Sequence, residues 1–356
     1  MKILFAGGGT LGPVTPLLAV AEAWRRIDPT VEFVWVGTPR GPERSLVETA
    51  DIRFLSLPVA RLTRYPSMEW ILFPVNLFRA VRGAWTILKQ ERPHLVASAG
   101  GYTGVPLTIA ARILGIPSWL HQSDVRPILS SRLCAPFANW ITVAWEKTAK
   151  AFPARKTHVV GNPVRDSILA TDRSTALVRF GLDPLRPTVF AFGGGGGSLW
   201  LNRMMETVGA EIVKDANVIH LTGIGKLTSK LEGFGQNYLM EELLSDGMAD
   251  AFAAADVVVC RAGMGAITEL AAWKKPAIVI PLPNSPQEDN AVELSLADAA
   301  LVLRQDATTP QEFLEAIRGL LLDKARQVSY ATTIANLLPT QVSDFLVKRL
   351  RSLATK

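Results

Sequence analysis

One segment, residues 256–290, constrains the fold more than any other part of the sequence. A valine-rich run at 257–259 leads directly into a turn of small residues that contains Gly263 and Gly265, and a helix-like stretch and a second apolar run at 277–281 follow. This order of strand, glycine turn, helix and strand is typical of a parallel βαβ unit. Taken alone, the unit is either an ordinary crossover or a pocket in which N–H groups at a helix N-terminus bind a nucleotide diphosphate.

The same pattern occurs in both halves of the chain. The first half opens with a predicted strand at 3–6, a glycine-rich turn at 7–13 and a helix pattern. The second half restarts with a predicted strand at 188–192, a loop of five glycines at 193–197 and another helix. Strands that alternate with helices form parallel sheets, so the sequence predicts an α/β fold of two doubly wound, Rossmann-like domains. The other predicted strands are 32–36, 94–98, 117–121, 140–144, 157–160, 218–221, 257–259, 277–280 and 301–303.

A boundary between the two domains is expected near Gly161, Asn162 and Pro163. It divides the chain into an N-terminal domain, 1–162, and a C-terminal domain, 163–339. The chain continues with a basic, helix-like segment at 340–356, which can pack back on the first domain.

Composition limits the kind of protein. Hydrophobic residues make up 48% and charged residues 20% of the chain, which describes a globular protein and excludes a disordered one. Cys134 and Cys260 show no CxxC or Cys/His spacing, so neither a disulfide scaffold nor a zinc site is supported. Residues 1–9 are predicted to form a strand leading into a loop, and not a signal peptide. These features indicate a cytosolic chain.

The formal net charge of +6 and the isoelectric point near 9.4 suit an anionic partner. Nucleic acid, an anionic membrane surface and a phosphorylated substrate would each explain this charge. Nucleic acid ranks last, because the sequence has no zinc-finger spacing, aromatic RNA-binding motif or long basic run. The GxxxxGK[ST] motif of P-loop nucleotidases is also absent, and residues 7–12 lack the spacing of a dinucleotide fingerprint.

Residues 61–92 combine cations with large apolar side chains such as Trp70, Phe73 and Trp85. A basic stretch with Trp and Phe suits a segment that lies on anionic lipid. The alternative is a core helix whose cations are simply solvated, and the pattern leaves both open. The six cations, set against two Glu, are Arg61, Arg64, Arg79, Arg82, Lys89 and Arg92.

Several segments occur together in an order typical of one family. They are GGGTLGPVTPLLAVAEA (7–23), SAGGYTGVPLTIAARILGIP (98–117), HQSD (121–124), VVGNPVR (159–165), GGGGGSLWLN (193–202), DVVVCRAGMGAITELAAWKKPAIVIP (256–281) and QEDNA (287–291). The set spans most of the chain and resembles the MurG-like, inverting GT-B glycosyltransferases. That resemblance implies two domains facing across a cleft, with UDP-N-acetylglucosamine as donor and a lipid-linked muramyl-peptide of peptidoglycan synthesis as acceptor. It also implies a peripheral position on the cytoplasmic face of the cell membrane, and no cofactor.

The resemblance also implies roles for particular residues. Glu269 would hold the ribose hydroxyls, and Arg165 would approach the diphosphate, which suits a guanidinium fork. Gln287 and Asn290 would bind the hydroxyls of the donor sugar. Considered singly, Arg165 could equally form a surface ion pair and Asn290 a helix cap. The other candidate substrate-binding residues are Thr10, Gly12, Gly101 and Tyr102 on the acceptor side, Asn162 near Arg165, and Gly195, Gly196, Ser198 and Gly263 on the donor side.

The sequence departs from the family pattern at three positions. Pro13, Gln122 and Gly195 stand where the family usually has His, Glu and Ser. Because Pro and Gln accept no proton at neutral pH, the ionisable candidates for the base of an inverting transfer are Asp124 and His121. An Asp after a strand is often a turn former, and a His at a strand end is often structural. No DxD-type pair stands near the donor motif, so no metal is predicted.

Other functions share much of this pattern. A glycolipid glycosyltransferase or a UDP-sugar 2-epimerase would have a similar donor half but a different acceptor half. A non-catalytic, membrane-associated protein that binds UDP-sugars is the alternative outside enzymes, and the changes at Pro13 and Gln122 keep it open.

Overall fold

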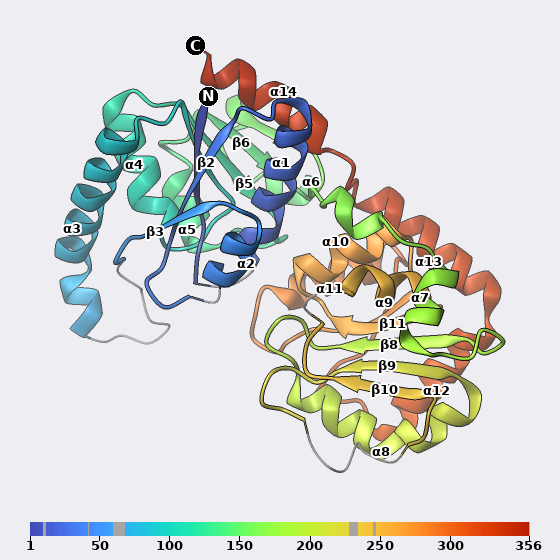
Figure 1. Cartoon of the computed structure of the whole chain (residues 1–356). Coiled ribbons are helices and arrows are strands. Elements are labelled where there is room, and N and C mark those ends of the chain that lie inside the picture. Colours follow the sequence, from blue (N-terminus) through green and yellow to red (C-terminus); the bar gives the residue numbers. More distant parts are fainter. Residues whose placement is uncertain (10–11, 42, 60–67, 228–233, 245–246, 356) are drawn as a thin grey trace. The chain divides into compact units, whose positions relative to one another are not determined.

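The chain forms two compact units, Met1–Arg165 together with Gln341–Lys356, and Asp166–Thr340. The computed structural model describes residues 1–355 except 10–11, 42, 60–67, 228–233 and 245–246 (Figure 1). Each unit contains one wholly parallel sheet with helices on both faces. The predicted class, α/β with two doubly wound domains, is therefore confirmed.

Unit 1 is built on a seven-stranded sheet with the order β3-β2-β1-β4-β5-β6-β7. The strands are β1 (Lys2–Ala6), β2 (Glu32–Gly37), β3 (Arg53–Ser56), β4 (Leu95–Ser98), β5 (Ser118–Gln122), β6 (Trp140–Val143) and β7 (Thr157–Val159). Because every pair is parallel, all the carboxyl ends lie at one edge of the sheet. Ligands of doubly wound sheets bind outside this edge.

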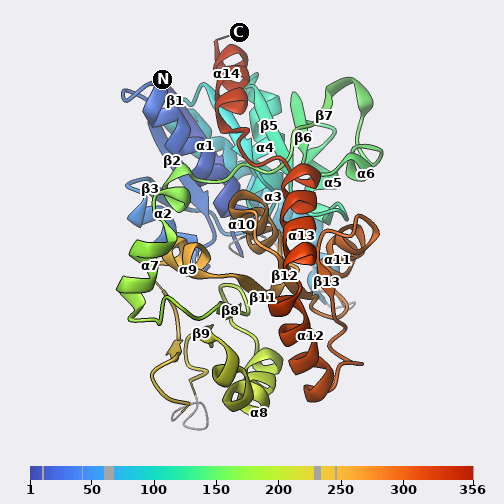
Figure 2. The ribbon, with the colours of Figure 1, turned by 90° about the vertical axis from the view of Figure 1, so that its right-hand side faces the viewer.

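The helices of unit 1 bury one face each against this sheet. In the first helix, Leu17, Val20 and Trp24 are fully buried, as the apolar pattern predicted. The last helix packs beside it, and its Leu346 and Leu350 join the same core cluster (Figures 1 and 2). These helices are α1 (Val14–Ile27), α2 (Glu43–Thr49), α3 (Met68–Glu91), α4 (Gly104–Leu114), α5 (Leu129–Cys134), α6 (Glu146–Ala149) and α14 (Ser343–Ala354).

Unit 2 repeats the design with a six-stranded sheet of order β10-β9-β8-β11-β12-β13. Its strands are β8 (Thr188–Phe192), β9 (Asn217–Leu221), β10 (Tyr238–Glu241), β11 (Val257–Arg261), β12 (Ala277–Ile280) and β13 (Leu301–Val302). Its helices are α7 (Arg173–Phe180), α8 (Leu199–Asp215), α9 (Met248–Ala254), α10 (Met264–Trp273), α11 (Gln287–Leu296), α12 (Pro310–Leu322) and α13 (Lys324–Leu337).

The predicted strands are all present, but two further strands were not predicted. β3 and β10 each form the edge of a sheet and are only partly buried. An edge strand that is half exposed needs no continuous apolar run, so its sequence carries a weak signal.

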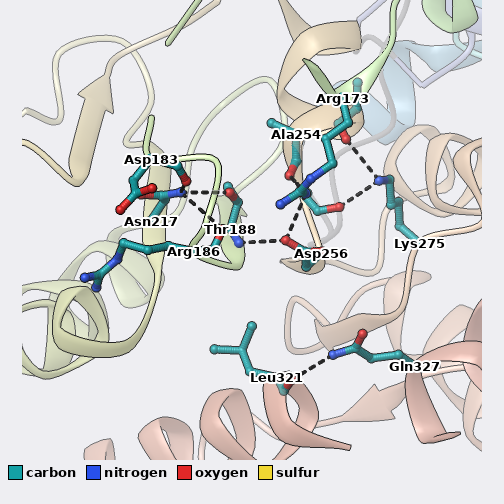
Figure 3. A network of polar contacts seen from close by, with 12 residues as sticks. Arg173, Asp183, Arg186, Thr188, Asn217, Ala254, Asp256, Lys275, Leu321 and Gln327 are labelled. Carbon is teal, nitrogen blue, oxygen red and sulfur yellow. Dashed lines mark hydrogen bonds and ion pairs between the residues drawn. The ribbon is translucent and has the colours of Figure 1, made fainter. Parts of the chain in front are cut away.

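A polar network closes the amino-terminal edge of the unit 2 sheet (Figure 3). Asp256, just before β11, accepts a hydrogen bond from the Thr188 backbone N–H at 2.8 Å and pairs with Arg173 at 2.9 Å. Lys275 donates to the carbonyl oxygens of Ala253 and Ala255. An ion pair thus ties the amino-terminal edge of this sheet.

Candidate functional site

In unit 1 the two glycine turns of the carboxyl edge are in backbone contact. Gly101 has φ of +86°, and a Cβ on it would lie 2.7 Å from the Gly8 carbonyl oxygen. A larger residue at position 101 would therefore push the two turns apart. The Tyr102 ring lies over Gly9 and is 40% exposed. Gly101 and Tyr102, both acceptor-side candidates, thus stand beside the first glycine turn.

A buried carboxylate holds the first glycine turn. Glu43, at the start of α2, is fully buried and accepts hydrogen bonds from the Thr38 backbone N–H at 2.7 Å and the Thr38 hydroxyl at 2.6 Å. Its other oxygen accepts from the Gly9 N–H at 3.3 Å. The N–H group of Gly9 is therefore already used by the protein. Glu43 was not predicted from the sequence as a functional residue.

His121 is fully buried at the end of β5, and both ring nitrogens are engaged. Trp119 donates to the Thr142 hydroxyl, and His121 Nδ1 lies 2.8 Å from that same hydroxyl oxygen. His121 Nε2 lies 2.7 Å from Asn162 Oδ1, which can only accept, so Nε2 carries the proton. Burial lowers the pKa of His121 to about 4. A neutral ring with both nitrogens bonded fits a structural role, and it ties the segment before Arg165 to the sheet.

Asp124, the other candidate base, lies half-buried in the loop that follows β5. Gln122 shapes this loop, because its amide donates to the backbone carbonyls of Asp124 at 2.9 Å and Arg126 at 3.4 Å. Trp145 donates to the Ser123 carbonyl as well. A carboxylate in place of Gln122 would face two carbonyl oxygens, so this loop is built around an amide.

The remaining unit 1 candidates lie around the same edge. Gly12 is exposed in the turn before α1, and Pro13 is the residue that precedes this helix. Arg165, the last residue of unit 1 before the link, is half-buried and forms no hydrogen bond or ion pair with any residue that the structure describes. Thr10 lies outside the described residues.

In unit 2 the five-glycine loop packs against the loop after β9. Gly197 and Gly223 both have positive φ, and a Cβ on Gly197 would lie 2.3 Å from the Thr222 carbonyl oxygen. Ser198 then caps α8, since its hydroxyl accepts from the Leu201 N–H at 3.3 Å. Gly195 and Gly196 are exposed at the tip of the loop. Gly195, Gly196 and Ser198, the three donor-side candidates of this loop, therefore lie within residues 195–198.

The second glycine turn of unit 2 brings together the other donor-side candidates. A Cβ on Gly263 would lie 3.7 Å from Gln287 Nε2, and the Asn290 amide donates to the Ala262 carbonyl at 3.1 Å. Asn290 is fully buried, which fits a residue that shapes the turn, whereas Gln287 is partly exposed. Glu269 is half-buried in the second turn of α10. Gly263, Gln287 and Asn290 are thus neighbours at the carboxyl edge, and Glu269 lies on the helix that begins there.

Arg261 ends β11 at this edge, and it is only 8% exposed. One guanidinium nitrogen donates to the carbonyls of Ile280 and Pro281, each at 3.3 Å. The other donates to Ser198 Oγ and Gln305 Oε1, both at 2.7 Å. The side chain thereby connects the loops after β8, β12 and β13. Arg261 was not predicted as a functional residue, although a cation directly after a buried valine run is a signal that the sequence shows.

One helix of unit 1 exposes a mixed apolar and basic face. The inner face of α3 buries Ala84 and Leu88, and α3 packs on α4. On its outer face, Leu72, Val75, Phe78 and Trp85 are between 37% and 69% exposed, beside the exposed Arg79, Arg82 and Lys89. Arg61 and Arg64 lie outside the described residues. Among the described helices, none is long and apolar enough to cross a bilayer.

The chain is similar to known proteins over nearly its whole length. The model of the glycosyltransferase family 28 N-terminal domain matches residues 3–143, and that of the C-terminal domain matches 188–344. A relative from a Nocardioides species is 35% identical and covers 98% of this chain and 97% of its own. A relative from Paenarthrobacter aurescens is 34% identical and covers 92% of this chain and 89% of its own. Both bear the name UDP-N-acetylglucosamine–N-acetylmuramyl-(pentapeptide) pyrophosphoryl-undecaprenol N-acetylglucosamine transferase.

Solved structures share the fold. MurG of Acinetobacter baumannii superposes with a TM-score of 0.76 at 22% identity, over 99% of both chains. A putative UDP-N-acetylglucosamine 2-epimerase from Listeria monocytogenes superposes with a TM-score of 0.72 at 14% identity, over 99% of this chain and 96% of its own. Transferases and epimerases thus have the same GT-B fold, and the fold alone does not separate them.

Proposed function

The chain belongs to glycosyltransferase family 28, and on that premise we propose that it transfers N-acetylglucosamine from UDP-N-acetylglucosamine to undecaprenyl-pyrophosphoryl-N-acetylmuramyl-pentapeptide. This reaction makes it an inverting hexosyltransferase of peptidoglycan synthesis. One observation carries the proposal: identity of 35% with a transferase of this name extends over 98% of the chain. Because the match includes the acceptor half, it favours this transfer over epimerisation, which would require only a similar donor half.

In this proposal unit 2 binds the donor. Glu269 accepts from the ribose hydroxyls, and Gln287 contacts the sugar. The glycine loops at 193–198 and 262–266 offer N–H groups to the diphosphate, as helix N-termini commonly do. Arg165 adds a guanidinium that forms no hydrogen bond or ion pair with any described residue. Stabilisation of the departing UDP needs such donors and cations.

Unit 1 binds the acceptor and supplies the base. Asp124 takes the proton from the attacking hydroxyl, because His121 is buried and neutral with both nitrogens bonded. Tyr102 and Gly101 stand beside the first glycine turn, where the acceptor pyrophosphate binds.

We further place the protein peripherally on the cytoplasmic face of the cell membrane, with the outer face of α3 on anionic lipid. Four exposed apolar side chains and three cations share this face, which is the pattern of an interfacial helix. Replacing Phe78 and Arg82 with Ser should release the protein from anionic vesicles, measured by sedimentation. Equal binding of wild type to anionic and neutral vesicles would contradict the charge contribution.

The decisive experiment for the reaction incubates the protein with UDP-N-acetylglucosamine and a short-chain analogue of the lipid-linked acceptor. We expect released UDP and an acceptor that has gained one N-acetylglucosamine, detected by mass spectrometry. Conversion of the donor sugar without acceptor would indicate an epimerase. Donor binding without turnover would indicate a non-catalytic relative in which Pro13 and Gln122 mark lost chemistry.

A further inference from the structure

The charged side chains at the two ends of strand β11 have different partners. At its amino end, Asp256 and Arg173 form an ion pair, so each charge has a counter-charge (Figure 3). At its carboxyl end, Arg261 has only neutral partners: two carbonyls, one hydroxyl and one amide oxygen. Among the described residues no carboxylate forms an ion pair or hydrogen bond with Arg261.

A cation that is buried without an anion destabilises a folded protein, so the burial of Arg261 without a carboxylate partner needs an explanation. The four hydrogen bonds use four of the five N–H donors of Arg261 but leave its charge uncompensated. Burial lowers the pKa of Arg261, yet a guanidinium stays protonated at neutral pH. The charge lies at the edge of the sheet where doubly wound folds bind ligands, beneath the capped N-terminus of α8. An anion at this edge would provide the missing counter-charge.

We propose that Arg261 is a positioning residue of the donor site, which fixes the loops after β8, β12 and β13 and supplies from inside the protein a positive charge for the diphosphate of the nucleotide sugar. The inference rests on the proposed donor site in unit 2 and adds a role to it. Arg261 acts through Ser198 and through its field, without contact to the ligand. Gln305 is important because it is neutral: it holds the guanidinium in place and leaves the charge free to act on the ligand.

Two substitutions of Gln305 separate charge from hydrogen bonding. Gln305→Glu keeps an acceptor for Arg261 but neutralises its charge, and Gln305→Ala removes the acceptor but leaves the charge. If the charge serves the diphosphate, Gln305→Glu weakens UDP binding roughly tenfold, as expected for a full charge near the ligand in a partly buried site. Gln305→Ala should weaken it less than about threefold. A purely structural role predicts the reverse order.

Calorimetry with UDP and with uridine provides the test. We expect Gln305→Glu to lower the affinity for UDP and leave that for uridine unchanged, while its melting temperature equals or exceeds that of wild type. Gln90→Glu, the same change at an exposed position of α3 in unit 1, is the matched control and should bind UDP normally. Equal UDP affinity of wild type and Gln305→Glu, or an equal loss for uridine, would overturn the inference. Failure of the wild type to bind UDP would instead overturn the proposed function.

Discussion

The first glycine loops of the two units are held by opposite charges. In unit 1 the buried carboxylate of Glu43 accepts from the Gly9 N–H. In unit 2 the buried guanidinium of Arg261 donates to Ser198, directly after the five-glycine loop. Both loops follow the first strand of a parallel sheet, so their backbones look alike, yet the carboxylate disfavours an anion nearby and the guanidinium favours one.

In the proposed function, this difference gives the two similar sheets separate tasks. A nucleotide diphosphate carries more charge than any other part of the donor, and the unit 2 loop suits it. In the unit 1 loop, the Gly9 N–H already donates to Glu43. The lipid-linked substrate that accepts the sugar must therefore bind to other groups there, such as the Gly101 turn. We therefore expect substitutions at the unit 1 edge, Arg165 apart, to change acceptor use and turnover, and substitutions at the unit 2 edge to change donor affinity.

Asp124→Asn tests most directly whether the two units have separate roles, and it should have the largest effect. If Asp124 is the base, its loss lowers kcat by about 10²–10⁴, because Asn cannot accept the proton. UDP affinity should stay at the wild-type value, since Asp124 lies in unit 1. The measurement combines steady-state turnover of the acceptor analogue with calorimetry of UDP.

Normal turnover in Asp124→Asn would place the base elsewhere. A loss of UDP affinity together with kcat would show that the loop after β5 also serves the donor, and the two units would then not be specialised. A melting temperature near that of wild type is the control for folding.

The fold was predictable because its strands are buried on both faces. Runs such as 257–259 and 188–192 are apolar throughout, and a parallel sheet covered by helices requires this. The partly exposed edge strands β3 and β10 have no such run and were missed. For the site, the glycine turns were predicted from spacing, whereas Glu43 was not. Its role depends on a contact with Gly9, 34 residues earlier, which no local pattern reveals.

The second prediction uses a feature that the units share. His121 and His220 are both buried, and each places Nε2 against an Asn oxygen and Nδ1 against a hydroxyl. Burial lowers the pKa of each to about 4 from 6.5. The unfolded chain therefore binds protons below pH 6.5 that the native state does not take up until about pH 4. Between these values the free energy of unfolding therefore decreases as the pH is lowered, and above pH 6.5 neither His contributes to its pH dependence.

Urea denaturation at pH 7 and pH 5 measures this effect. We expect a loss of roughly 2 kcal/mol for each His over that interval. His220→Gln keeps an acceptor and a donor but cannot titrate, so it should remove about half of the loss, and His121→Gln the other half. If one variant removes all of it, the other His takes up its proton at the same pH in the native and unfolded states, and the two units differ although their structures are alike.

The smallest effect is expected for Glu43→Gln, which tests the unit 1 half of the comparison directly. The Gln oxygen can still accept from Thr38, but its NH₂ group would face the Gly9 N–H, donor against donor. The lost bond should cost about 1–2 kcal/mol of unfolding free energy. Because the first glycine turn is then no longer held, KM for the acceptor should rise while UDP affinity stays constant.

Glu48→Gln, on the same helix but half exposed and paired with Arg44, is the matched control and should cost at most about 0.5 kcal/mol. If UDP affinity in Glu43→Gln falls by the same factor by which the acceptor KM rises, the charges of the two loops do not give the units separate roles in donor and acceptor binding.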